Sequence, residues 1–227
     1  MDLSYLFFAF LIVVIVTSLF QTATWCLIVF FKNPGLVDVA WPVGIWLIAC
    51  LYGGYFIEDF INSFFTLPLP IILLMLSLSI WMLRLSLYLF LTRVAKGHKD
   101  KRYMAMYEKW GDNALWMMWL SCQFQGLCQL LLSVSFIFVF LFSSTSSMLW
   151  ICLTAMFVFG VGIIGECIAD YQLYQFKQTN KLKRAFCKKG LWAYSRHPNY
   201  FFELLLWFGM ATFSISNIVG FIAYLGP

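Results

Sequence analysis

Charge is scarce in this chain of 227 residues, in which 11% of the residues are charged and 63% are hydrophobic. Soluble domains are typically about 25% charged and about 45–50% apolar. The composition therefore excludes an ordinary soluble globule, and it also excludes a disordered chain, which would be poor in apolar residues. Long runs without Asp, Glu, Lys or Arg cover residues 3–31, 113–165 and 204–227. Because about 20 apolar residues cross a bilayer as a helix, the sequence predicts an all-α, polytopic transmembrane helix bundle.

Histidine is rarer still, with two in the chain, and the seven cysteines include no C-x-x-C pair. Zinc sites use closely spaced Cys and His ligands, so we expect no metal site. We interpret the cysteines as small buried hydrophobes. No basic segment precedes the first apolar run, which we therefore expect to be a membrane span and not a cleaved signal peptide.

We expect six spans in a single integral membrane domain covering residues 1–227. The predicted spans cover about residues 6–31, 39–57, 70–91, 116–142, 148–169 and 198–225, with a turn at the serine-rich stretch 143–147. No internal repeat and no nucleic-acid-binding module is indicated.

The distribution of basic residues predicts the orientation of the chain. Arg84 lies within a span, and the other 14 of the 15 Lys and Arg follow the first, third and fifth spans, mostly in the loops 92–113 and 170–197. Because Lys and Arg favour the cytoplasmic side, these loops are expected in the cytoplasm and the N-terminus outside. Part of this charge would attract anionic membrane lipids, and another part would bind an anionic cofactor or substrate.

Ionisable residues within spans are costly to bury, so each indicates a function or a structural pairing. Arg84 lies nine residues before Arg93, which places it about 13 Å deeper in a helix. Glu166 and Asp170 are four residues apart and share one helix face, and Glu203 lies about one turn into the last span. Two interpretations stay open: an ion pair of Arg84 with Glu166 or Glu203, or a polar pocket that faces the cytoplasm.

The segment 190–203, GLWAYSRHPNYFFE, is the richest in polar groups. Pro198 suits the first turn of a helix, where a missing N–H is no loss, and His197 and Asn199 flank it. The free N–H groups and positive dipole end of such a helix attract anions, and Arg196 adds a guanidinium suited to phosphate or carboxylate. The alternative is an ordinary interfacial helix start with aromatic anchors.

Gly160, Gly162 and Gly165 have the G-x-G-x-x-G spacing of a dinucleotide-binding loop. That fingerprint requires a preceding strand and a βαβ unit, whereas these glycines lie within an apolar helical segment. We therefore interpret them as small residues that allow close helix packing.

These segments together resemble the steroid 5-alpha-reductase-like membrane enzymes, and most closely a small bacterial branch of that family. The resemblance covers nearly the whole chain. Besides 190–203, the matching segments are GECIADYQLYQFK (165–177), VDVAWP (37–42), WMLRLSLYLFLTR (81–93), DKRY (100–103) and FQG (124–126).

The resemblance implies a helix bundle in the bacterial inner membrane that binds NADPH on its cytoplasmic side. Such an enzyme reduces a carbon–carbon double bond conjugated to a carbonyl in a lipid-soluble, steroid- or isoprenoid-like substrate. Together with the anion site at 190–203, the motif positions imply cofactor binding by Arg84, Arg93, Glu166, Asp170, Lys177, Arg196, His197 and Asn199, and catalysis by Tyr200 and Glu203. Tyr55 and Glu58 suit the pair that holds the substrate carbonyl, but the predicted topology puts them on the opposite face.

Two other functions stay open. The R-H-P-x-Y element at 196–200 also occurs in membrane isoprenylcysteine carboxyl methyltransferases, which bind S-adenosylmethionine, although this leaves the 170–177 stretch unexplained. The third possibility is a membrane protein without catalytic activity. Reductase relatives usually continue past the Gly-Pro at 226–227 into another span and a basic tail that helps close the cofactor site. We expect this chain to lack that segment, which favours the third interpretation or an inactive enzyme.

Overall fold

The computed structural model describes residues 3–57, 60, 66–95, 101–142, 149–179 and 186–215. These residues form helices and connecting turns, with no strand among them, which confirms the all-α prediction. In chain order the helices are α1 (Leu3–Phe31), α2 (Leu36–Phe56), α3 (Leu69–Leu89), α4 (Lys101–Trp110), α5 (Ala114–Phe142), α6 (Leu149–Thr179) and α7 (Pro198–Thr212). A π-helical turn (Phe90–Val94) continues α3, and 3₁₀ turns cover Gly111–Asn113 and Gly190–Ala193.

In the described part of the chain, five helical segments are long and apolar enough to cross a membrane. They correspond to the first five predicted spans. Their outer faces expose large hydrophobic side chains, such as Phe30 at 78% and Phe157 at 71%. Hydrophobic surface of this extent is found on proteins whose surroundings are lipid. The chain is therefore a multi-pass membrane protein.

The sixth predicted span, 198–225, is longer than the helix that the structure describes. α7 begins at Pro198, as predicted, but it ends at Thr212. In the turn that follows, the Ser214 hydroxyl donates to the carbonyl oxygen of Ala211 at 2.6 Å. Hydroxyls that bond nearby carbonyls in this way compete with regular helix hydrogen bonds, which is consistent with the helix ending here.

Several expectations concern residues outside the described ranges. They are the serine-rich turn at 143–147, Glu58, and the end of the sixth span with the Gly-Pro at 226–227.

Helices also extend into both segments predicted as basic loops. α6 continues to Thr179 instead of ending near Ala169, because Asp170, which seemed to end the span, forms an ion pair inside the bundle. The predicted loop 92–113 contains α4, a short helix whose polar and apolar residues fall on separate faces. The predicted basic segments therefore contain helix as well as connecting loop, and their place on the cytoplasmic side stays a prediction.

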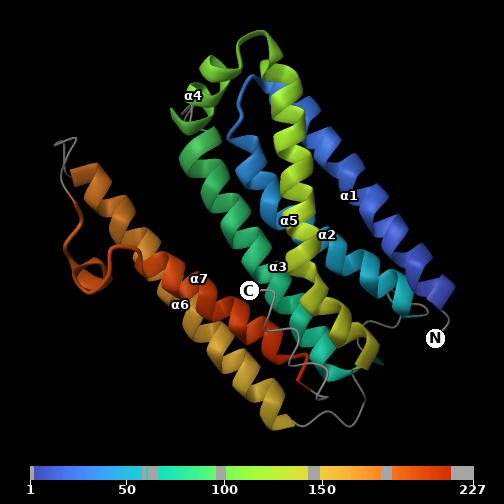
Figure 1. Ribbon diagram of the computed structural model, residues 1–227. Helices are drawn as coiled ribbons and strands as arrows, with labels where there is room; N and C mark the ends of the chain where they lie inside the picture. The colour runs from blue at the N-terminus through green and yellow to red at the C-terminus, as the bar shows by residue number, and fades with distance from the viewer. Residues whose placement is uncertain are drawn as a thin grey trace.

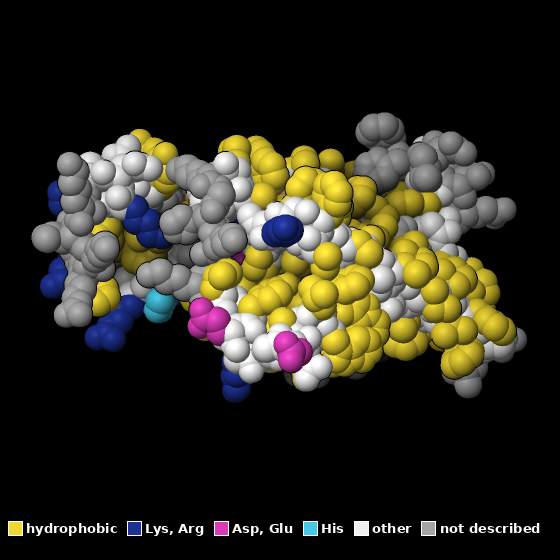
Figure 2. All heavy atoms as spheres, turned by 90° about the horizontal axis from the view of Figure 1, so that it is seen from above, with side chains coloured by type: hydrophobic (Ala, Val, Ile, Leu, Met, Phe, Trp, Pro, Cys, Tyr) yellow, Lys and Arg dark blue, Asp and Glu magenta, His cyan; other side chains and the backbone are white. Residues whose placement is uncertain are grey.

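The helices alternate in direction, so that the connections after α1, α3 and α6 lie at the same end of the bundle (Figure 1). We call this end the basic end. The described Lys and Arg side chains outside the spans lie there: Lys32, Arg93, Arg102, Lys109, Lys177, Lys188, Lys189 and Arg196. Figure 2 looks down from above onto this end and shows Lys and Arg side chains beside broad hydrophobic surfaces. The one-sided distribution of charge is confirmed, while its location in the cytoplasm stays a prediction.

α6 and α7 form a closely packed antiparallel pair, and α3 contacts both of them. A Cβ at Gly162 would lie 2.6 Å from the backbone nitrogen of Leu206, and Gly165 lies against the ring of Phe202. Gly160 has no described atom outside its own helix turn within 4 Å of such a Cβ. The interpretation of these glycines as packing residues is confirmed for Gly162 and Gly165 and is wrong for Gly160.

Aromatic side chains join the α6–α7 pair to the other helices. Trp81 of α3 is fully buried and meets Trp207 of α7 edge to face, with ring centroids 5.1 Å apart. Phe136 of α5 stacks on Trp207 at 6.0 Å. Aromatic pairs of this kind contribute about 0.5–1.5 kcal/mol each beyond their buried area. They fix the position of α7 relative to α3 and α5.

We predict that Gly162→Ala lowers the melting temperature of the protein in detergent, whereas the matched Gly160→Ala does not. The new methyl group at 162 would press on the Leu206 backbone, 2.6 Å away, and overpacking typically costs about 1–3 kcal/mol. At position 160, alanine would gain about 0.5–1 kcal/mol from its better helix propensity. Equal melting temperatures for the two variants would contradict the described packing.

Candidate functional site

Arg84 of α3 lies at the centre of a buried polar cluster, with its side chain 15% exposed. Its guanidinium forms ion pairs with Glu166, where Nη1 lies 2.5 Å from Oε1, and with Asp170. The two carboxylates are one turn apart on α6, so one planar guanidinium reaches both. The ring centroid of Tyr88 lies 5.7 Å from Arg84 Cζ, at a cation–π distance.

Two tryptophans fix Glu203 of α7 beside these residues. Its Oε1 accepts hydrogen bonds from Nε1 of Trp81 at 3.1 Å and of Trp207 at 3.0 Å. Glu203 also lies within electrostatic reach of Glu166. We call Arg84, Tyr88, Glu166, Asp170 and Glu203 together the Arg84 cluster. Neither tryptophan was singled out from the sequence, because an indole in an apolar span looks like any other core side chain.

One interpretation of the sequence was a structural ion pair of Arg84 with Glu166 or Glu203, and it is confirmed in part. Within the described residues, Arg84 pairs with Glu166 but not with Glu203. It also pairs with Asp170, which was not predicted as its partner. Two carboxylates pair with the guanidinium, and Glu203 adds a third carboxyl group near Glu166 and Asp170. Such an excess of acceptors suits ligands that carry amide, hydroxyl or cationic groups better than it suits a phosphate.

Unpaired polar atoms also lie in this region. Within the described part of the structure, buried Glu166 Oε2 and Asn199 Oδ1 accept no hydrogen bond from an N–H or O–H group, although the Glu166 carboxyl lies within hydrogen-bond reach of the Glu203 carboxyl. Arg84 Nη1 contacts Glu166 without hydrogen-bond geometry. Asn199 lies one turn before Glu203 on α7. A buried polar group without a hydrogen-bond partner costs about 1–3 kcal/mol. A bound molecule that donates a hydrogen bond to such an acceptor would remove this cost. The cluster thus has capacity for a ligand that donates hydrogen bonds.

Arg93 lies in a second cluster, which we call the Asp38 cluster. The π-helical turn brings Arg93 to Asp38 of α2, with which it forms an ion pair. Asp38 also accepts a hydrogen bond from the Tyr103 hydroxyl at 2.9 Å, and Arg102 Nη2 lies 3.5 Å away. Three matching segments, VDVAWP, WMLRLSLYLFLTR and DKRY, therefore meet here. Asp38 was missed, although an acidic residue at the start of an apolar span could have identified it.

The remaining predicted residues lie at the surface of the basic end. Lys177, Arg196 and His197 are exposed. Tyr200 is 64% exposed, and its ring stacks on His197 with centroids 5.2 Å apart. Tyr200 and Glu203 are three residues apart on α7, so the two positions lie within about 60° of each other around the helix. The Tyr200 ring stacks on His197, whereas the Glu203 carboxylate accepts from Trp81 and Trp207. A joint catalytic role of these two residues stays a prediction.

The start of α7 is held against α6 by the 3₁₀ turn before it. The Trp192 indole donates to the carbonyl oxygen of Ala169 at 2.9 Å, and the Leu191 amide donates to Gln172 Oε1 at 2.9 Å. Gly190 has a positive φ of 59°, which glycine adopts without strain. This turn sets the position from which Pro198 begins the helix.

A family model described as "Protein of unknown function (DUF1295)" matches residues 24–227, which is most of the chain. No curated protein and no solved structure matches the chain.

We predict that Arg84→Met strongly lowers the melting temperature, because Glu166 and Asp170 would be left as buried charges without a partner. Removing one member of a buried ion pair costs about 3–5 kcal/mol. Adding Asp170→Asn to this variant should restore part of the loss. Lys109→Met, on an exposed part of α4, is the control for loss of a positive charge. A melting temperature of Arg84→Met equal to that of the control would contradict a structural role of the ion pairs.

Proposed function

We propose that this chain, which belongs to the DUF1295 family, is an NADPH-dependent membrane reductase of a conjugated carbon–carbon double bond in a lipid-soluble substrate. The observation that carries the proposal is the pair of buried acceptors, Glu166 Oε2 and Asn199 Oδ1, which accept no hydrogen bond from an N–H or O–H group among the described residues. They lie toward the basic end of the bundle. The reaction class comes from the resemblance of its motifs to steroid 5-alpha-reductase-like enzymes.

The nicotinamide half of NADPH fits the Arg84 cluster by its hydrogen-bonding groups. The carboxamide N–H groups and the ribose hydroxyls are donors, and the buried oxygens of Glu166 and Asn199 are acceptors. Glu203 offers a further carboxylate, which Trp81 and Trp207 hold in one orientation. Arg84 then keeps the α6 carboxylates in place and does not itself bind a phosphate.

The phosphates of NADPH require cations, and the Arg84 cluster offers none in excess. We assign this role to exposed side chains at the basic end: Lys177, Lys188, Lys189 and Arg196. The N-terminus of α7, where Pro198 occupies the first turn, adds free N–H groups and a positive dipole end. Arg93 is a weaker candidate because it already pairs with Asp38.

NADPH, when bound, supplies the hydride. The chain's own residues orient the cofactor, exclude water and deliver a proton to the carbonyl oxygen as negative charge develops there. We assign proton delivery to Tyr88, whose ring lies 5.7 Å from Arg84 Cζ. Glu203 is better suited to anchoring, because its Oε1 already accepts two N–H bonds. Tyr200 is 64% exposed, which favours a surface role.

One observation favours a second candidate, a methyltransferase that uses S-adenosylmethionine. This cofactor carries a sulfonium and an ammonium group. The Arg84 cluster contains three carboxyl groups, two of them paired with its one guanidinium, and this excess of carboxyl groups would attract such cations. The R-H-P-x-Y element at 196–200 fits this reading as well.

Thermal stabilisation by cofactor distinguishes these functions. We predict that NADPH raises the melting temperature in detergent by mass action, that NADH raises it less, and that S-adenosylmethionine has no effect. Asn199→Ala should weaken NADPH binding about two- to tenfold, the loss expected for one neutral hydrogen bond. Asn113→Ala, at an exposed asparagine between α4 and α5, is the matched control.

Stabilisation by S-adenosylmethionine and not by NADPH would replace the reductase with the methyltransferase. Stabilisation by neither cofactor, in a protein that melts cooperatively, would contradict both enzymes.

A further inference from the structure

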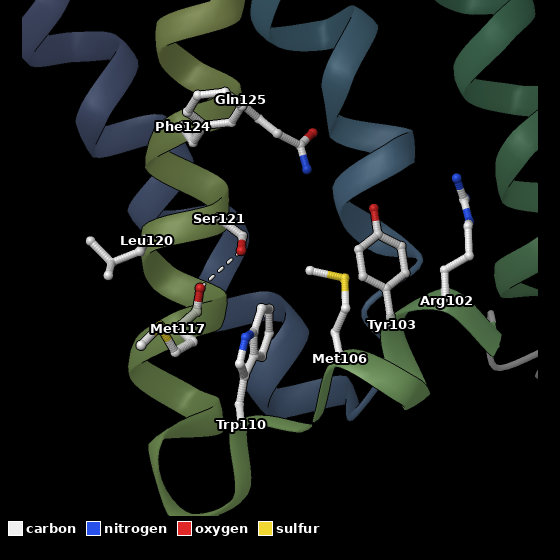
Figure 3. Close-up of a pocket in the computed structure, with 9 residues that line it drawn as sticks. All are labelled: Arg102, Tyr103, Met106, Trp110, Met117, Leu120, Ser121, Phe124 and Gln125. Atoms are coloured by element: carbon white, nitrogen blue, oxygen red, sulfur yellow. Dashed lines mark hydrogen bonds between the residues drawn. The ribbon is translucent and has the colours of Figure 1, made fainter. Parts of the chain in front are cut away.

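A groove of about 480 Å³ lies between α4 and α5 at the basic end, away from the Arg84 cluster. Figure 3 shows Tyr103 and Met106 of α4 and Gln125 of α5 pointing into the space between the two helices, while Leu120 points away from it. The groove is open on one side. The function proposed above uses neither helix, so this inference is independent of it.

The lining of the groove divides into a polar part and an apolar part. The polar part contains the Arg102 guanidinium, on a side chain that is 67% exposed, and the Gln125 amide. The apolar part contains Met106, Trp110 and Phe124. A ligand that fills both parts must itself have a charged or polar head and a hydrophobic chain.

The position of the groove matches the boundary between water and hydrocarbon. α4 has a polar face and an apolar face, as helices that lie in a membrane interface do. α5 begins at Ala114 as an apolar span, and its side chains next to the groove are exposed, with Phe124 at 65% and Leu127 at 51%. Lipid molecules therefore reach the groove from the side.

Charge complementarity selects the kind of lipid. Between residues 101 and 110, the chain has the cations Lys101, Arg102 and Lys109 against one anion, Glu108. Arg102 contacts Asp38 at 3.5 Å and lies over the Tyr103 ring, while its side chain is 67% exposed. Because a guanidinium has five N–H donors, Arg102 can bind a phosphate and keep these contacts. Arginine binds phosphate oxygens with charge-assisted hydrogen bonds.

We infer that the α4–α5 groove binds one anionic phospholipid, with the phosphate at Arg102 and Gln125 and the first part of an acyl chain along Met106, Trp110 and Phe124. A bound lipid joins α4 to α5. It also lies next to the Asp38 cluster, through which α4 contacts α2, so it holds α4 in its described position.

The test uses delipidated full-length protein in a neutral detergent, with bound lipid counted by native mass spectrometry and melting temperature measured in parallel. The probes are phosphatidylglycerol, phosphatidylcholine with the same acyl chains, and glycerol phosphate as a soluble headgroup. We expect one phosphatidylglycerol to bind and to raise the melting temperature, with weaker effects of the other two. Arg102→Gln should weaken this binding about tenfold, the fold-change for losing one charge-assisted hydrogen bond, and Arg102→Lys should retain most of it.

Two further variants keep the proposal falsifiable if Arg102→Gln folds poorly. Ser121→Leu puts a larger side chain into the groove, whose lining includes Ser121, and should reduce lipid binding while Arg102 is intact. Lys109→Gln removes a charge from the same helix but outside the groove lining, and should reduce binding much less than Arg102→Gln does. Equal losses from Lys109→Gln and Arg102→Gln would show general surface attraction and overturn the site. Equal binding of phosphatidylcholine, or an equal shift with glycerol phosphate, would overturn it as well.

Discussion

A guanidinium inside an apolar helix bundle requires carboxylates next to it, and much of the site follows from this one constraint. Arg84 is largely buried at its position in α3, where its side chain is 15% exposed. Moving an unpaired charge into such surroundings costs several kcal/mol. Glu166 and Asp170 supply the compensating charge from α6. These ion pairs bind the α6–α7 pair to α3.

The same constraint orients the groups around the ion pairs. With α6 fixed on α3, close packing at Gly162 and the aromatic contact of Trp207 with Trp81 determine where α7 lies. That position brings Glu203 to two indole donors. Arg84 makes one contact with each of its two carboxylates, so Glu166 Oε2, like Asn199 Oδ1, accepts no hydrogen bond from a described donor. The proposed ligand would supply donors to these two oxygens.

The features predictable from the sequence are those that depend on neighbouring residues. Long apolar runs located the first five spans, and helix periodicity put Glu166 and Asp170 on one face. Contacts between distant segments were not predictable. Arg84 and Arg93 look equivalent in sequence, but one pairs across 86 positions with Asp170 and the other across 55 positions with Asp38. For the same reason, the sequence placed the end of the fifth span just before Asp170. A carboxylate that pairs with a cation on another helix can lie inside a helix without ending it.

A structure with NADPH bound would show where the cofactor lies in the bundle. The measurement is cryo-electron microscopy of the protein in lipid nanodiscs at saturating NADPH, with a bound antibody fragment to allow alignment. We expect the nicotinamide and its ribose within hydrogen-bond distance of Asn199 and Glu166, with the phosphates toward Arg196 at the basic end. A well-ordered Arg84 cluster with no nucleotide beside it, or a nucleotide bound elsewhere in the protein, would rule out this location.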